Sequence, residues 1–125
     1  PEDMVWLVNT VQGVTELPLS IDTANPKALA AALATVNRTP LVNSISGERA
    51  RLEGVLPQAA AAGSPVVALA LDDTGIPAST EQRMDVIRGL IEATGGRVTA
   101  RQSDLGGLAM DFDLPMVAFT DEPAQ

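Results

Sequence analysis

The sequence has no cysteine and no histidine, and aromatic residues are rare. Without cysteine, disulfides, thiolate catalysis and Cys-based metal sites are excluded. Without histidine, the chain lacks the commonest general base, the Ser-His-Asp triad and His-ligated zinc. Only oxygen ligands remain for a metal ion, and no spacing typical of a calcium-binding EF-hand loop is present. Trp6, Phe112 and Phe119 are the only aromatic residues, so the core must be aliphatic.

Basic residues and long apolar runs are also scarce. Eight Lys and Arg residues stand against sixteen Asp and Glu residues, which gives a net charge of −8. This balance argues against binding to nucleic acid or to an anionic lipid membrane.

No apolar run approaches the ~20 residues of a membrane span, and no signal peptide is found, so we expect a cytoplasmic location. The 125 residues, 46% of them hydrophobic, suit one domain or part of a larger one.

Helices and strands are predicted to alternate along the first 94 residues. Apolar periodicity and helix-start residues predict helices near 2–13, 26–36, 48–62 (with a break at Pro57) and 79–94, and strands at 18–21, 40–43 and 64–71. Short connections between such elements favour a parallel sheet with helical crossovers. The segment 64–71 is almost entirely apolar, which is typical of a strand buried on both faces.

Residues 95–125 follow a different pattern. Two short alternating segments, 97–102 and 108–112, flank a turn at 104–107 and predict an antiparallel hairpin. A further strand is expected at 114–120 and a frayed tail at 121–125. We therefore divide the chain into a βα segment, 1–94, and a β-hairpin extension of different origin, 95–125.

Two of the predicted strands end in polar side chains with matching spacing. Asp22 and Asn43 are 21 residues apart, about the length of one strand–helix–strand repeat. The carboxyl ends of parallel strands share one edge, where α/β proteins bind ligands, so we expect Asp22 and Asn43 side by side, with Ser44 next to them. Asp72 follows the third strand and is expected on the same edge. A carboxylate beside a carboxamide can match a flat heterocycle that presents hydrogen-bond donors and acceptors.

Each of these residues also has a structural interpretation. Asp22 could cap the following helix, and Asn43 is open to the same alternative. Asp72 could belong to a solvent-exposed turn. Arg49 and Arg51, on the predicted third helix, are expected to be solvated rather than functional.

Three motifs suggest a family. They are Pro18-Leu19-Ser20-Ile21-Asp22-Thr23, Leu41-Val42-Asn43-Ser44-Ile45-Ser46-Gly47-Glu48, and Asp73-Thr74-Gly75-Ile76-Pro77, the last being the most discriminating. The chain resembles, over about residues 1–94, the pterin-binding methyltransferases that move a methyl group from methyltetrahydrofolate to a corrinoid protein. It is similar, more distantly, to the pterin domain of cobalamin-dependent methionine synthase and to dihydropteroate synthase. The family fold is a TIM barrel with the pterin at its carboxyl rim.

The resemblance implies roles for the polar strand ends. Asp22 and Asn43 correspond to residues that hydrogen-bond the pterin ring, and Ser44 and Asp72 are expected beside them as pterin contacts. Methyl transfer requires a positioned ring, with its N5 protonated or polarised, while a Co(I) nucleophile displaces the methyl group. No cofactor is expected to bind this chain directly, because methyltetrahydrofolate is the methyl donor and the corrinoid belongs to a partner protein.

A complete TIM barrel takes ~250 residues, so we expect a partial, half-barrel α/β fold with a C-terminal antiparallel hairpin. Residues 96–112 resemble instead a terminal hairpin of histidine-kinase ATPase domains, which suggests a natural truncation, a fusion product or a deliberately recombined chain. Two alternatives to a methyltransferase stay open. One is a truncated or chimeric module with a structural or assembly role, and the other is a small flavodoxin-like ligand module with five parallel strands. The open edges of a half-barrel also predict homo-oligomerisation.

Overall fold

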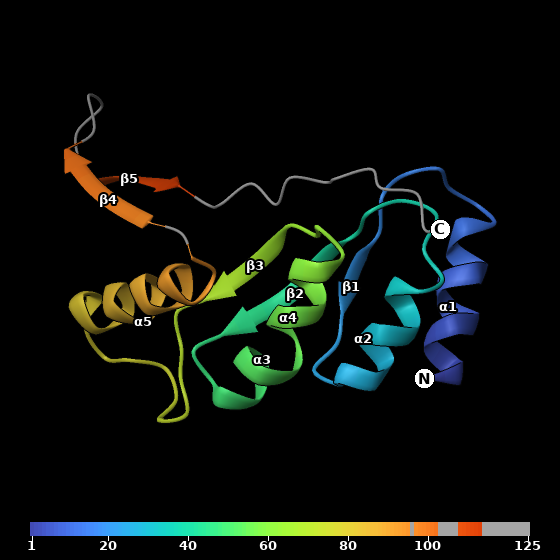
Figure 1. Cartoon of the computed structure of the whole chain (residues 1–125), viewed down its shortest axis with the longest axis horizontal. Coiled ribbons are helices and arrows are strands. Elements are labelled where there is room, and N and C mark those ends of the chain that lie inside the picture. The colour runs from blue at the N-terminus through green and yellow to red at the C-terminus, as the bar shows by residue number, and fades with distance from the viewer. Residues whose placement is uncertain (96, 103–107, 114–125) are drawn as a thin grey trace, which may run out of the picture.

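A computed structural model describes residues 1–95, 97–102 and 108–113, the last two ranges by their backbone only (Figure 1). The elements follow one another in the order α1 (Glu2–Gln12), β1 (Ser20–Asp22), α2 (Pro26–Leu33), β2 (Leu41–Ser46), α3 (Arg49–Gly54), α4 (Leu56–Ala61), β3 (Val66–Leu69), α5 (Thr80–Ala93), β4 (Arg97–Gln102) and β5 (Leu108–Asp113). The predicted turn 104–107, strand 114–120 and tail 121–125 lie outside the described residues.

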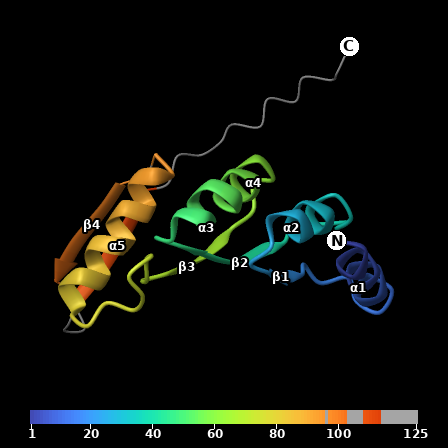
Figure 2. The same cartoon turned by 90° about the horizontal axis from the view of Figure 1, so that it is seen from below.

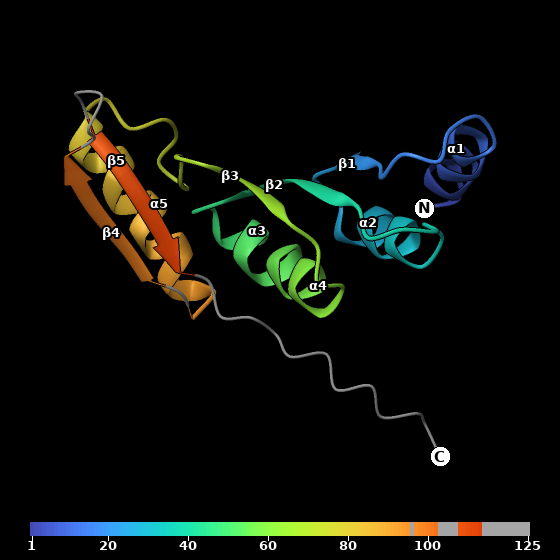
Figure 3. The same cartoon turned by 90° about the horizontal axis from the view of Figure 1, so that it is seen from above.

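The strands β1, β2 and β3 form one parallel sheet in that order. Helices α2, α3 and α4 lie on one face of this sheet, as Figures 2 and 3 show from opposite sides. This arrangement confirms the predicted α/β alternation and fits part of a TIM-barrel-like fold. None of the described helices is long and apolar enough to cross a membrane.

The hydrophobic core lies between the sheet and its helices. Its fully buried members are aliphatic, as the composition predicts, and come from both layers: Val8, Ile21, Leu29, Ala32, Val42, Ile45, Val55, Ala59 and Leu90. Helix α1 packs against α2 at one end of this layer (Figure 2). There the Gln12 side chain donates to the Thr35 carbonyl and accepts from the Asn37 N–H.

Local chemistry explains where the helices begin. The Asn25 side chain accepts hydrogen bonds from the N–H groups of Lys27 and Ala28, and Pro26 takes the first helical position of α2. At α5, Ser79 and Gln82 form a reciprocal capping box. The break expected at Pro57 is present, because α3 ends at Gly54 and α4 begins at Leu56. These starts confirm the helices predicted from capping residues.

A register shift in β2 sets which side chains face the helices. Val42 and Ile45 are both buried in the core, although residues three apart on a regular strand point to opposite faces. The pairing of β2 with β3 shifts between Asn43 and Ile45, which returns Ile45 to the helical side. Asn43 comes directly after Val42 and before the shift, so its side chain points to the opposite face of the sheet.

The prediction that the third strand is buried on both faces is wrong. Val66 and Val67 of β3 are half-buried, and Ala68 and Leu69 are exposed. The described helices cover only one face of the sheet, and β3 is one of the two edge strands of the described sheet. An apolar run signals the capacity for two-sided burial, but neighbouring elements decide whether both faces are covered.

The strands β4 and β5 pair with each other in antiparallel register, from Arg97 opposite Asp113 to Gln102 opposite Leu108. They lie beside α5 rather than in the parallel sheet (Figure 3). This separate pair does not favour the flavodoxin-like alternative, which needs five strands in one parallel sheet. The boundary at residue 95 and the different origin of residues 95–125 stay predictions.

Candidate functional site

Asp22 and Asn43 are direct register partners at the carboxyl ends of β1 and β2. The residues before them, Ile21 and Val42, are also partners and are buried toward the helices. Because side chains alternate along a strand, Asp22 and Asn43 project to the face that the described helices leave uncovered. Asp22 is exposed and Asn43 is half-buried, so both can meet a ligand. The structure thus brings the two residues together as the spacing predicts.

Ser44 lies next to Asn43 but is covered. It falls within the register shift of β2, has no register partner on β3, and is only 7% exposed. Its carbonyl oxygen, like that of Thr23 after Asp22, accepts a hydrogen bond from Arg51. The structure therefore places Ser44 at the predicted edge with its side chain turned away from solvent.

Asp72 follows β3 at the same edge of the sheet. Its carboxylate accepts hydrogen bonds from the Thr74 hydroxyl at 2.6 Å and the Thr74 N–H at 2.8 Å. These two hydrogen bonds hold the pKa of Asp72 below its ordinary value, and the bond from the hydroxyl has the larger effect. Its backbone pairs with Gly75, whose φ of +104° suits a glycine. The turn interpretation therefore fits Asp72, whose residue is half-buried rather than fully exposed.

Asp73 has a role that the sequence interpretation missed. Both of its carboxylate oxygens lie 3.3 Å from the backbone nitrogen of Arg49, the first residue of α3. The N-terminal end of a helix carries unpaired N–H groups and favours a negative charge. Asp73 thus joins the loop after β3 to the start of α3, which fixes the Asp73-Thr74-Gly75-Ile76-Pro77 motif against the rim.

The expectation that Arg51 is solvated is wrong, whereas Arg49 is exposed as predicted. The Arg51 side chain is 23% exposed, and its partners are two main-chain carbonyls and the Glu48 carboxylate. Every residue has a main-chain carbonyl, so the sequence does not show which carbonyls an arginine will bind. The sequence could have indicated only the ion pair with Glu48, because the N-cap residue of α3 lies three residues before Arg51.

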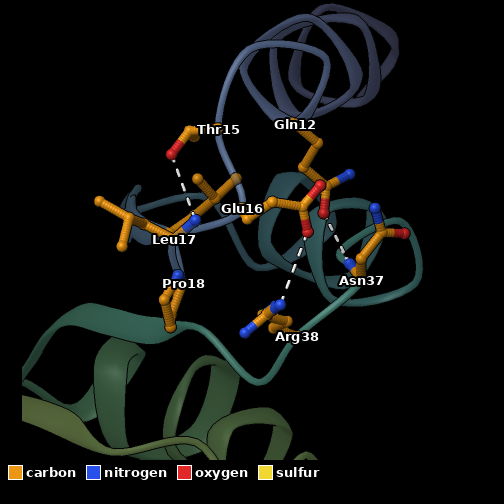
Figure 4. Close-up of a pocket in the computed structure, with 8 residues that line it drawn as sticks. Gln12, Thr15, Glu16, Leu17, Pro18, Asn37 and Arg38 are labelled. Carbon is orange, nitrogen blue, oxygen red and sulfur yellow. Dashed lines mark hydrogen bonds and ion pairs between the residues drawn. The ribbon is translucent and has the colours of Figure 1, made fainter.

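Among the cavities in the described part of the chain, one lies at each of two opposite edges of the sheet. An open groove of about 570 Å³ lies beside the carboxyl edge and is lined by Asp72, Thr74, Ile76, Pro77, Ala78, Gln82, Asp85 and Val86. The second, at the amino edge, holds about 20 Å³, room for a single water. Figure 4 shows it spanned by the Glu16–Arg38 ion pair and by the bond from the Asn37 N–H to Gln12. In the described part of the chain, no three carboxylates gather where they could hold a metal ion.

Comparisons with known proteins agree with this geometry. The family model described as pterin binding enzyme matches residues 1–104, which include the whole rim and β4. The chain is 32% identical, over 93 residues, to a methylcorrinoid:tetrahydrofolate methyltransferase of Eubacterium limosum. That alignment covers 73% of this chain and 34% of the relative, so the chain spans about a third of the relative's length. On these two matches, the chain belongs to the pterin binding enzyme family.

Proposed function

We propose that the rim formed by β1 and β2 binds the pterin ring of a tetrahydrofolate for methyl transfer involving a corrinoid protein. One observation carries the proposal: Asp22 and Asn43 are register partners and project from the same uncovered face at the carboxyl edge. Ligands of parallel α/β proteins bind at this edge. Membership in the pterin binding enzyme family supports a pterin as the ligand.

The chemistry of the pair suits a pterin. An ionised Asp22 only accepts hydrogen bonds, whereas the carboxamide of Asn43 both donates and accepts. The pyrimidine edge of a pterin presents an amino group, a ring N–H and acceptor atoms in one plane, so it can satisfy both side chains. Of the four predicted residues, these two carry the proposal. The Ser44 side chain is covered, and the Asp72 carboxylate already accepts two hydrogen bonds from Thr74.

The proposed reaction moves a methyl group from methyltetrahydrofolate to the cobalt of a corrinoid held by a partner protein. The relative's name writes the transfer in the other sense, from a methylcorrinoid to tetrahydrofolate. Both senses need the same pterin, held with its N5 toward the corrinoid, so one rim serves either direction. In this proposal the described residues bind and orient the ring, and the partner supplies the cobalt.

Isothermal titration with tetrahydrofolate tests the proposal. We compare the wild-type chain with the Asp22→Ala/Asn43→Ala double variant and with Ser20→Ala as the control. Ser20 is an exposed residue at the other end of β1, on the same face of the strand. We expect binding by the wild type and by the control, and a loss of at least about tenfold in affinity in the double variant. No binding heat in the wild type, or equal affinities in all three proteins, would refute the proposal.

A further inference from the structure

Arg51 contacts the residue that follows each of the two proposed pterin contacts. Its Nη1 lies 3.2 Å from the carbonyl oxygen of Thr23 and 3.3 Å from that of Ser44. Thr23 follows Asp22, and Ser44 follows Asn43. A single guanidinium nitrogen on α3 therefore joins the ends of β1 and β2, immediately beyond the pair that the proposed function uses.

The guanidinium is held in turn by a short chain of polar contacts. The Glu48 carboxylate oxygen that lies 3.8 Å from Arg51 Nε also accepts a hydrogen bond of 2.7 Å from the Ser46 hydroxyl. Ser46 ends β2 and is only 1% exposed. The orientation of Arg51 is thus tied to a buried residue of the strand that it contacts, which favours one position of the side chain over many.

Backbone hydrogen bonds alone hold the carboxyl ends of β1 and β2 only weakly in position. The last bond between the two strands runs from the Thr23 N–H to the Asn43 carbonyl, at 3.2 Å. On its other side, β2 shifts register against β3 between Asn43 and Ile45. Hydrogen bonds from a charged donor are stronger than those between neutral groups. Arg51 supplies two such bonds at the point where the ladder is least regular.

We propose that Arg51 is a positioning residue that fixes the separation of the Asp22 and Asn43 side chains, and through them the affinity for the pterin. The inference rests on the proposed function for its ligand. Binding groups that converge on one rigid ring lose affinity steeply when their spacing changes, because both cannot then reach good geometry at once. If the ends of β1 and β2 were flexible, the same ring would bind more weakly even with the Asp22 and Asn43 side chains intact.

The test compares Arg51→Met, Arg51→Lys and the matched control Arg49→Met. Arg49 lies on the same helix, carries the same charge and is exposed. We expect Arg51→Met to raise the Kd for tetrahydrofolate about tenfold, Arg51→Lys to recover part of that loss, and Arg49→Met to bind like the wild type. All titrations are run at a temperature where the variants are folded, as checked by urea unfolding. A purely structural role would lower the unfolding midpoint and leave the Kd unchanged.

A second measurement separates this inference from the proposed function. In the ligand-free protein, we expect the Asn43 side-chain amide and the backbone amides of Thr23 and Ser44 to shift in the NMR spectrum of Arg51→Met but not of Arg49→Met. If the wild type binds no tetrahydrofolate while these resonances shift, the proposed function fails and Arg51 still positions the rim. If the resonances do not move, or the wild type binds and Arg51→Met binds equally well, the positioning role is refuted.

Discussion

The backbone N–H of Gly47 donates a hydrogen bond to the carbonyl of Leu71 at 2.8 Å, which joins the residues that follow β2 and β3. A Cβ atom at position 47 would lie 3.0 Å from the Leu71 carbonyl oxygen and 3.1 Å from Val86 Cγ1. This close approach explains why glycine stands between Ser46 and Glu48 in the second motif. A side chain at position 47 would force these neighbours to move by a few tenths of an ångström, so the close approach of the strand ends favours glycine.

Gly47→Ala should therefore destabilise the protein by about 1–3 kcal/mol, the usual cost of forcing an extra carbon into a packed site. Gly89→Ala is the matched control, because it lies within α5 and a Cβ there meets no atom of the described side chains within 4 Å. Alanine should stabilise that helix by about 0.5–1 kcal/mol. Urea unfolding measures both free energies. A Gly47→Ala variant as stable as the wild type would contradict the close packing.

The capping box at the start of α5 gives a second prediction. Ser79→Ala removes the acceptor for the Gln82 N–H and should cost about 1 kcal/mol of folding free energy. Ser79→Asp should retain most of the stability, because aspartate is also a good N-cap residue. The comparison is again made by urea unfolding. Equal losses in the two variants would show that the side-chain acceptor is unimportant.

The pKa of Asp72 provides a prediction on the loop after β3. In the folded protein the pKa of Asp72 is lowered mainly by the hydrogen bond from the Thr74 hydroxyl and to a smaller extent by that from the Thr74 N–H. The stabilisation is therefore complete above the unfolded pKa of about 3.9 and is lost as the pH falls through the lower folded pKa. Thr74→Val should raise the Asp72 pKa toward its ordinary value, and Thr74→Ser should leave it low. An NMR titration of the Asp72 carboxyl carbon measures this pKa in both variants. Identical curves would contradict the conclusion that the Thr74 hydroxyl lowers the Asp72 pKa.

The parts of the fold that depend on local chemistry could be predicted from the sequence. Asn25-Pro26 and the Ser79/Gln82 pair mark helix starts through contacts within four residues, and the structure contains both. The pairing of Asp22 with Asn43 also followed from spacing, because one strand–helix–strand repeat fixes where parallel strands end.

Other features depend on contacts that a sequence does not show. The covered position of Ser44 results from a register shift against β3, and Asp73 reaches an N–H 24 residues away. Arg51 binds main-chain carbonyls, which any residue provides. The exposure of Leu69 depends on what lies against β3, which its own composition cannot reveal. Burial and long-range polar contacts were therefore the parts that sequence reasoning missed.

Homo-oligomerisation remains a prediction with a clear test. In the described residues, one face of the parallel sheet carries no helix, and β1 and β3 have open edges. Unpaired strand edges and exposed side chains such as Leu69 favour association. We expect light scattering after size exclusion to give a mass above the 12.9 kDa of one chain. A single species at the monomer mass across a wide concentration range would contradict this expectation.

The most direct test of the pterin-binding rim is an NMR titration of the ¹⁵N-labelled chain with tetrahydrofolate. We expect saturable shifts in the backbone amides of Thr23, Asn43 and Ser44 and in the Asn43 side-chain amide, with smaller changes elsewhere. The Asp22→Ala/Asn43→Ala variant should show no such shifts at the same concentrations. Shifts confined to residues away from the ends of β1 and β2, or none at all, would contradict the proposal that this rim binds the pterin.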